Sequence, residues 1–179
     1  MINKYKETVG RFFLKRELKK LKRNKQNFSL DNAQTIGILY EYVNDDEFKV
    51  VDDLIHELQG LKKEVKVLSF IPGNNILEYI PQKLSVDYFQ QKDLSWYLSP
   101  KSTYLANFVE TQYDILIDLN LNDCFPLTYV AATSKAKYKV GIDKEGKMEI
   151  LDLIIRPKKK GLKEGIEEIL HFLKVLKSK

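Results

Sequence analysis

The chain has 179 residues, of which 44% are hydrophobic and 31% are charged, and its net charge is +5. This length supports one well-buried core, and a single cysteine, Cys124, excludes an internal disulfide framework. No apolar run is long enough to cross a bilayer, and the first residues lack the apolar stretch and cleavage site of a secretory signal. We therefore expect a cytoplasmic protein.

The positive charge is concentrated at the two ends of the chain. Residues 1–25 contain ten Lys and Arg against two Glu, and residues 156–179 contain eight against three, whereas residues 26–155 contain twelve against twenty acidic residues. An acidic body with basic ends is the asymmetry expected of a protein that docks on a polyanion. The alternative is that the basic segment neutralises its own acidic body or is simply a solvated face.

Strong helix formers without proline predict a helix over residues 3–24. One apolar face at helical spacing contains Ile2, Tyr5, Val9, Phe12 and Phe13. A second apolar row, on nearly the opposite side of this helix, contains Leu14, Leu18 and Leu21. Because the apolar stripe changes sides, we expect the two halves to pack on different bodies and to expose a basic stripe. The sequence thus predicts a basic helical arm at residues 1–27 and one α/β domain at residues 28–179.

After a polar connector, expected strands and helices alternate. The strands are predicted at residues 35–42, 65–71, 86–89, 113–121, 138–142 and 148–155. The helices are predicted at residues 46–59, 100–112, 126–136 and, as an amphipathic C-terminal helix, 162–177. This alternation predicts a doubly wound, mostly parallel Rossmann-like sheet, covered by helices on both faces and preceded by the basic N-terminal helix.

The stretch YDILIDLNLNDCFPLTYVAATSKAKYKVGIDKEGK (113–147) carries a resemblance to a known family. The residues concerned are Tyr113, Asp114, Ile117, Asp118, Leu119, Ser134, Ala136, Lys137, Gly141 and Asp143. They resemble a strand motif YDxxIDL and a following SxAKxxxGxD in the N-terminal Rossmann-like half of the heptosyltransferase family of glycosyltransferases. The resemblance covers most of residues 35–155 and implies a Rossmann-like fold.

The chain departs from that family in two respects. The family binds its nucleotide-sugar donor on a second Rossmann-like domain, which we expect this chain to lack. The turn after the first strand, YVNDDEF, offers Asp45 or Asp46 as the family's acidic residue but has no glycine to let the backbone approach a phosphate. The resemblance therefore implies the fold and a degenerate, non-catalytic domain. The chain is also similar to small bacterial single-domain proteins of unknown function.

Polar residues gather where the expected strands end. Asp118, Asn120, Asn122 and Asp123 lie at or after the end of the central strand, and Asp46 follows the first strand. Ligands of open α/β sheets bind at this edge, so a small-ligand site is one interpretation. The interpretation we favour is that these residues form turns and caps, with Asn122 or Asp123 capping the helix near Pro126.

The sequence offers little support for catalysis. Cys124 precedes a predicted helix, whose dipole would lower the pKa of its thiol, but a nucleophile also needs a base. His56 and His171 lie on predicted helices remote from it, so a buried structural cysteine is the favoured interpretation. The sequence has no metal-ligand spacing, Walker loop or GxGxxG motif, and we expect no catalytic residue, metal or cofactor.

The density of Lys and Arg in the arm decides our functional hypothesis. The expected RNA contacts are Arg11, Lys15, Arg16, Lys19, Lys20, Lys22, Arg23 and Lys25, with a second contact from Lys158, Lys159 and Lys160. The sequence contains no RNA-binding motif, so it predicts recognition of backbone and shape, with no readout of DNA sequence. We expect a non-catalytic, ribosome-associated protein that docks on structured RNA. The alternatives are an interfacial helix on anionic membrane and a helix that packs on its own domain or on a second subunit, with its basic face solvated.

Overall fold

A computed structural model describes residues 4–73, 80, 82–144, 150–159 and 161–176. Its strands are β1 (Thr35–Glu41), β2 (Glu64–Phe70), β3 (Val86–Phe89), β4 (Ile115–Asp118), β5 (Tyr138–Ile142) and β6 (Leu153–Ile155). Its α-helices are α1 (Lys4–Leu18), α2 (Asp45–Gly60), α3 (Thr103–Glu110), α4 (Phe125–Thr133) and α5 (Leu162–Val175). A short 3-10 helix, η2 (Gln91–Asp93), follows β3.

The six strands form one sheet in the order β3-β2-β1-β4-β5-β6, and all neighbouring strands are parallel. Ile117 of β4 lies between Ile38 of β1 and Val140 of β5 in the sheet register. All three side chains are fully buried, as expected for central strands covered on both faces. The direction in which strands are added reverses between β1 and β4, and their carboxyl ends mark the position where open α/β sheets bind ligands.

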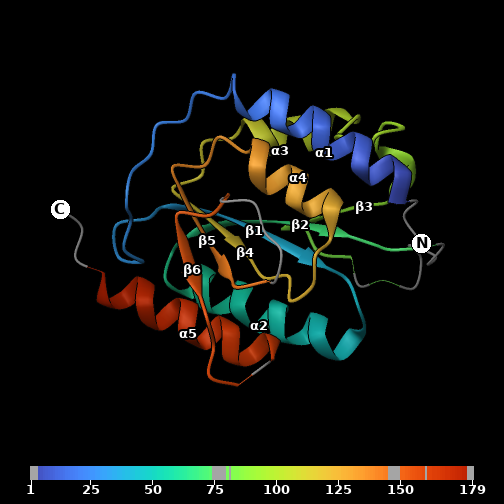
Figure 1. The fold of residues 1–179 in the computed structure, drawn as a ribbon. Coiled ribbons are helices and arrows are strands. Elements are labelled where there is room, and N and C mark those ends of the chain that lie inside the picture. The colour runs from blue at the N-terminus through green and yellow to red at the C-terminus, as the bar shows by residue number, and fades with distance from the viewer. Residues whose placement is uncertain (1–3, 74–79, 81, 145–149, 160, 177–179) are drawn as a thin grey trace.

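Helices cover both faces of the sheet (Figure 1). On one face, α2 and α5 share a core with side chains of β1, β4 and β5. On the other face, α3 and α4 cover the sheet, and α1 packs against α4 on the same side. The doubly wound, parallel Rossmann-like fold predicted from the sequence is confirmed.

The central and last strands are shorter than predicted. β4 ends at Asp118 because the next residues turn, and Asn120 donates from its backbone N–H to the Asp118 carboxylate. β6 begins only at Leu153, and residues 148 and 149 of its predicted range lie outside the described residues. Helix α3 begins after its predicted start because Pro100 is held in a bridge with Leu94.

The predicted 3–24 helix is wrong in length and in orientation. Helix α1 ends at Leu18, and the chain then turns and runs extended along the body, where the Gln26 N–H donates to the Lys137 carbonyl. The inner face of α1 is centred on Gly10 and Leu14. Tyr5 and Phe12, which the apolar pattern assigned to the packed face, are 71% and 66% exposed. Ile2 lies outside the described residues.

Gly10 explains how closely α1 approaches the body. A Cβ at this position would lie 2.4 Å from the Tyr97 carbonyl oxygen and 2.6 Å from Cε1 of Phe125. No side chain larger than hydrogen fits there without a shift of backbone. The arm helix is therefore tightly packed on its own domain at Gly10 and Leu14, and only its outer side is available to a partner.

Candidate functional site

The outer side of the arm carries a run of exposed cations. We call Lys15, Arg16, Lys19, Lys20 and Lys22 the arm surface. All five are exposed, and none forms an ion pair with another described residue. Lys25 is also exposed, although its Nζ lies 3.3 Å from Asp152. The structure thus confirms the exposure predicted for these side chains.

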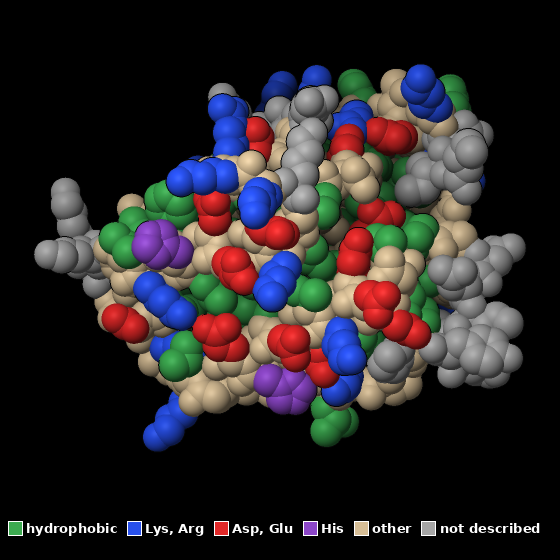
Figure 2. Space-filling view, turned by 90° about the horizontal axis from the view of Figure 1, so that it is seen from below, with side chains coloured by type: hydrophobic (Ala, Val, Ile, Leu, Met, Phe, Trp, Pro, Cys, Tyr) green, Lys and Arg blue, Asp and Glu red, His purple; other side chains and the backbone are tan. Residues whose placement is uncertain are grey.

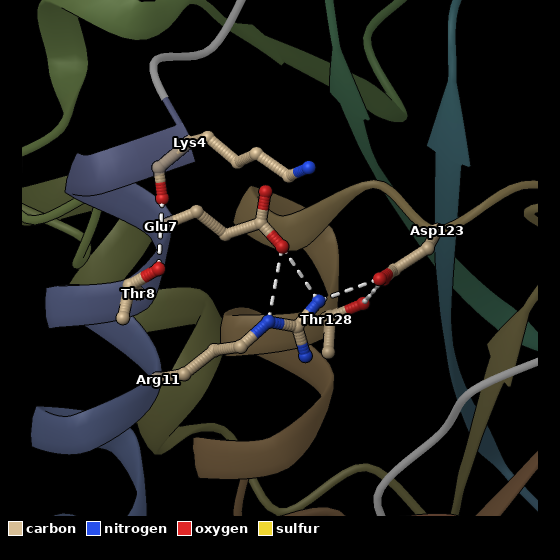
Figure 3. Close-up of polar contacts among 6 residues, drawn as sticks. All are labelled: Lys4, Glu7, Thr8, Arg11, Asp123 and Thr128. Carbon is tan, nitrogen blue, oxygen red and sulfur yellow. Dashed lines mark hydrogen bonds and ion pairs between the residues drawn. The ribbon is translucent and has the colours of Figure 1, made fainter.

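Arg11, the first predicted RNA contact, is already engaged within the protein (Figure 3). Its guanidinium lies 2.7 Å from Glu7 and 2.6 Å from Asp123, and it stacks over the Phe125 ring. Burial would lower the pKa of Arg11, but the hydrogen bonds to Glu7 and Asp123 outweigh it and raise the pKa. Arg11 joins α1 to the loop after β4, so it is not a free cation of the arm.

Arg23 is likewise committed to the body. Its side chain is 6% exposed, and Nη2 donates to Asp152 at 2.5 Å. Burial opposes the charge of Asp152, but hydrogen bonds from Arg23 and from the Lys139 N–H outweigh it and lower the pKa of the carboxyl. This ion pair fixes the extended segment after α1 to the start of β6.

A pocket of about 360 Å³ opens beside Arg23, at the edge of the sheet where the parallel strands begin. We call it the amino-edge pocket, and it is lined by Lys22, Arg23, Asn24, Gln112 and Lys135. Gln112 and Lys135, which precede β4 and β5 at positions remote from the arm, were not predicted from the sequence. The only indication in the sequence is that each is a polar residue just before a buried strand. This position does not predict that the arm segment packs beside them.

The predicted second RNA contact lies elsewhere. Asp152 precedes β6 and binds Arg23, whereas Arg156 follows β6 and donates to Asp143 after β5. Lys158 and Lys159 are exposed and follow the carboxyl end of β6, whereas the arm segment is bound at the amino end of this strand. Lys160 lies outside the described residues. The structure does not bring these lysines to the arm surface.

The carboxyl edge of the sheet contains a buried polar network. Lys144, 2% exposed in its side chain, donates to Asp118 at 2.6 Å, and Asn120 donates to the same carboxylate through its backbone and side-chain N–H groups. The Asn120 Oδ1 atom is buried without a hydrogen-bond partner in the described structure. Asp118 and Asn120, predicted as edge residues, are brought together, and Lys144 is the partner that the sequence analysis missed.

A pocket of about 660 Å³, which we call the carboxyl-edge pocket, lies beside this network. Its lining comprises Leu121, Asn122, Asp123, Ile142, Asp143, Lys144, Arg156, Pro157 and Gly161. A smaller pocket of about 90 Å³ adjoins it and shares Leu121 and Asn122. Asp46 is exposed in the first turn of α2 and lines neither pocket.

The predicted capping of α4 is wrong. The N-cap residue is Cys124, and no side chain caps this helix end. Asp123 instead accepts a hydrogen bond from Thr128 and pairs with Arg11 (Figure 3). Cys124 is 5% exposed. Burial raises the pKa of its thiol, and the negative charge of Glu41 raises it further. The lowering expected from the helix dipole is therefore overturned, and the expected buried cysteine is confirmed.

Asp114, from the resemblance motif, has a structural role. Its carboxylate accepts hydrogen bonds from the backbone N–H groups of Gln34 and Thr35 and from Lys137. Burial opposes its charge, but these bonds outweigh it and lower the pKa of Asp114. The residue ties together the beginnings of β1, β4 and β5.

Residues 6–176 match a family described as Family of unknown function (DUF6913). The chain belongs to this family. The family match begins within α1 and ends after α5, so it includes both the arm helix and the α/β body. No curated protein matches the chain. Within the described residues, no helix is long and apolar enough to span a membrane, and no group of three or more His, Cys, Asp or Glu side chains is arranged to hold a metal ion.

Proposed function

We propose that this family member is a non-catalytic protein that docks on structured RNA, such as that of the ribosome, through the arm surface. The observation that supports this proposal best is the run of five exposed cations without an acidic partner in the described structure. The face formed by α2 and α5 differs, because Figure 2 shows Lys and Arg interspersed there with Asp and Glu. The arm surface should therefore attract a polyanion more strongly than the face of α2 and α5 does.

The physical basis of docking is the release of counterions from phosphates. Each Lys or Arg that neutralises a phosphate contributes to affinity and makes it fall with salt. Tyr5 and Phe12 lie exposed on the same outer side of α1 as Lys15 and Arg16. Aromatic rings beside cations stack on unpaired bases, which RNA presents in loops and bulges.

The same surface supports membrane association less well. A helix that lies on anionic lipid needs a broad apolar face opposite its cations. In α1 the apolar face is centred on Leu14, which is fully buried against the body. The exposed large apolar side chains of α1 are Tyr5 and Phe12, which stand among the cations. This composition favours RNA.

The test is a four-charge variant of the full-length protein, with Lys15, Arg16, Lys19 and Lys20 each changed to Gln. The matched control changes Lys49, Lys62, Lys101 and Lys163 to Gln; these are four exposed lysines outside both predicted RNA contacts. Binding to purified ribosomal RNA is measured by filter retention at several salt concentrations. We expect the arm variant to lose affinity and to reduce the slope of log K against log salt by up to about 3 to 4.

The control has the same net charge as the arm variant, so it separates local contact from overall charge. We expect the control to bind RNA within about twofold of the wild type, and both variants to unfold at the wild-type temperature because the changed side chains are exposed. Equal loss of RNA binding in both variants would contradict a specific docking surface. Binding to anionic vesicles but not to RNA would assign the surface to membranes.

A ligand at the carboxyl edge is the second candidate function. It is favoured by the carboxyl-edge pocket, which lies at the carboxyl ends of β4, β5 and β6 beside the buried Asp118–Lys144 pair, next to the smaller pocket at the switch point between β1 and β4. In this function the chain would be a degenerate glycosyltransferase-like domain that binds a small molecule. Glucose 6-phosphate, a small sugar phosphate without a nucleotide, is the probe, and it should raise the unfolding temperature of the wild type but not of Arg156→Ala. An equal effect on both proteins, or none, would contradict this candidate.

A further inference from the structure

The amino-edge pocket is built almost entirely from hydrogen-bond donors. Its lining residues supply two ammonium groups, one guanidinium and two amides, and none of them carries a carboxylate. The pocket is continuous with the arm surface, because Lys22 belongs to both. A site of this composition is suited to an anion with several acceptor oxygens.

Arg23 is the fixed element of this pocket. One terminal nitrogen, Nη2, donates to Asp152, whereas the other, Nη1, is buried and has no hydrogen-bond partner in the described structure. A buried donor without an acceptor costs free energy, and the cost is larger for a charged group. The guanidinium is therefore held in place by one ion pair and still has the capacity to donate to a ligand.

The carboxylates near the pocket do not neutralise it. Asp152 pairs with Arg23 and Lys25, and Glu110 pairs with Lys135. Four cations, Lys22, Arg23, Lys25 and Lys135, thus face two carboxylates. At the buried Lys139, burial and then the positive charges of Arg23 and Lys25 lower the pKa of the ammonium, against the opposite effect of Asp152.

We infer that the amino-edge pocket binds a phosphate group, with the Arg23 guanidinium, the Lys22 and Lys135 ammonium groups and the amides of Asn24 and Gln112 as donors. Planar guanidinium groups and lysines are the side chains that bind phosphate in proteins, and amides donate to the remaining oxygens. This inference rests on the proposed RNA docking for the source of the phosphate, which is one phosphodiester of the backbone. A free phosphate ester has the same chemistry.

The test compares Gln112→Glu with a matched control, Gln91→Glu. Each change converts an exposed amide into a carboxylate of the same shape, but only Gln112 lines the pocket. Thermal unfolding of the full chain is measured with inorganic phosphate and, at equal ionic strength, with chloride. We expect phosphate to stabilise the wild type and Gln91→Glu, and its Kd to rise at least tenfold in Gln112→Glu.

A second measurement, with ribosomal RNA, identifies the source of the phosphate. Inorganic phosphate should compete with ribosomal RNA more than chloride does at equal ionic strength, and Gln112→Glu should weaken RNA binding more than Gln91→Glu. If RNA binds but phosphate does not stabilise the wild type, or stabilises both variants equally, the pocket assignment is overturned and the docking proposal stands. If phosphate binds with the expected sensitivity to Gln112→Glu but RNA does not bind, the docking proposal and the RNA source are overturned.

Discussion

Lys139 lies in the interior at the start of β5, where its Nζ donates to the Ala132 carbonyl at 3.0 Å. Burial, followed by the positive charge of Arg23, lowers the pKa of Lys139 from 10.5 to about 7, although Asp152 acts in the opposite direction. The residue therefore changes charge within the range in which stability is easily measured, and the extended arm segment contributes to that change.

The pH dependence of stability follows from this shift. Between about pH 7 and pH 10 the unfolded chain binds a proton at Lys139 that the folded protein does not bind. The free energy of unfolding should therefore rise with pH across this interval, by up to about 1.4 kcal/mol per pH unit. Below pH 7 Lys139 is protonated in both states, so it should add nothing to the slope there. Urea unfolding at pH 7.5, 8.5 and 9.5 measures the slope. We expect Lys139→Met to flatten it, and an unchanged slope would contradict the assignment.

The thiol of Cys124 should be chemically unreactive in the folded protein. Burial disfavours its thiolate, and the thiolate is the reactive form. We expect the native thiol to react with a maleimide much more slowly than the urea-unfolded thiol, and Cys124→Ser to dock on RNA within about twofold of the wild type. Loss of function in a folded Cys124→Ser protein would instead point to an enzyme.

For individual basic residues, the sequence predicted which side chains are exposed better than it predicted which ones form ion pairs. The arm surface was expected to be exposed because lysines are rarely buried, and the structure agrees. Arg11 and Arg23 were expected to be free, but Asp123 and Asp152 bind them from more than a hundred residues away. Such pairs depend on which strand ends the fold brings together, and local sequence does not contain that information.

Among the elements, α1 allows the most direct test of how the arm is attached. Gly10→Ala places a Cβ against the Tyr97 carbonyl and the Phe125 ring. A helix alone would gain about 0.5–1 kcal/mol from this change, but we expect the clash to outweigh the gain and to destabilise the protein by about 1–3 kcal/mol. The unfolding free energy in urea measures the difference.

Gly60→Ala is the matched control, because this residue ends α2 and a Cβ there meets nothing within 4 Å. We expect Gly60→Ala to be neutral or slightly stabilising. A Gly10→Ala protein as stable as the control would mean that α1 does not pack on the body in solution.

The bounds of some strands could be predicted from the sequence, whereas those of α1 could not. The strands over residues 86–89 and 138–142 were predicted with their observed bounds, because short apolar runs between turn residues leave little freedom in assignment. Helix α1 was predicted to be too long because LKKLKRNK contains good helix formers. The Arg23–Asp152 pair and the Gln26–Lys137 backbone bond hold this stretch extended, so tertiary contacts override helix propensity.

For the whole molecule, the unequal distribution of charge is the feature that the functional proposal must explain. Exposed, unpaired cations continue from the outer side of α1 to the amino-edge pocket, whereas the face of α2 and α5 mixes both signs (Figure 2). Charge segregation was visible in the sequence. The pocket was not, because its residues come from three separate segments that only the parallel sheet places together.

Sedimentation of the protein from cell lysate through sucrose gradients at low and high salt tests whether the arm surface docks on ribosomal RNA. We predict that the protein migrates with ribosomal particles at low salt and is released to the top of the gradient at high salt, since phosphate contacts weaken steeply with salt. The variant with Gln at positions 15, 16, 19 and 20 should stay at the top at both salt concentrations. Wild-type protein that stays at the top at both concentrations would contradict docking on ribosomal RNA.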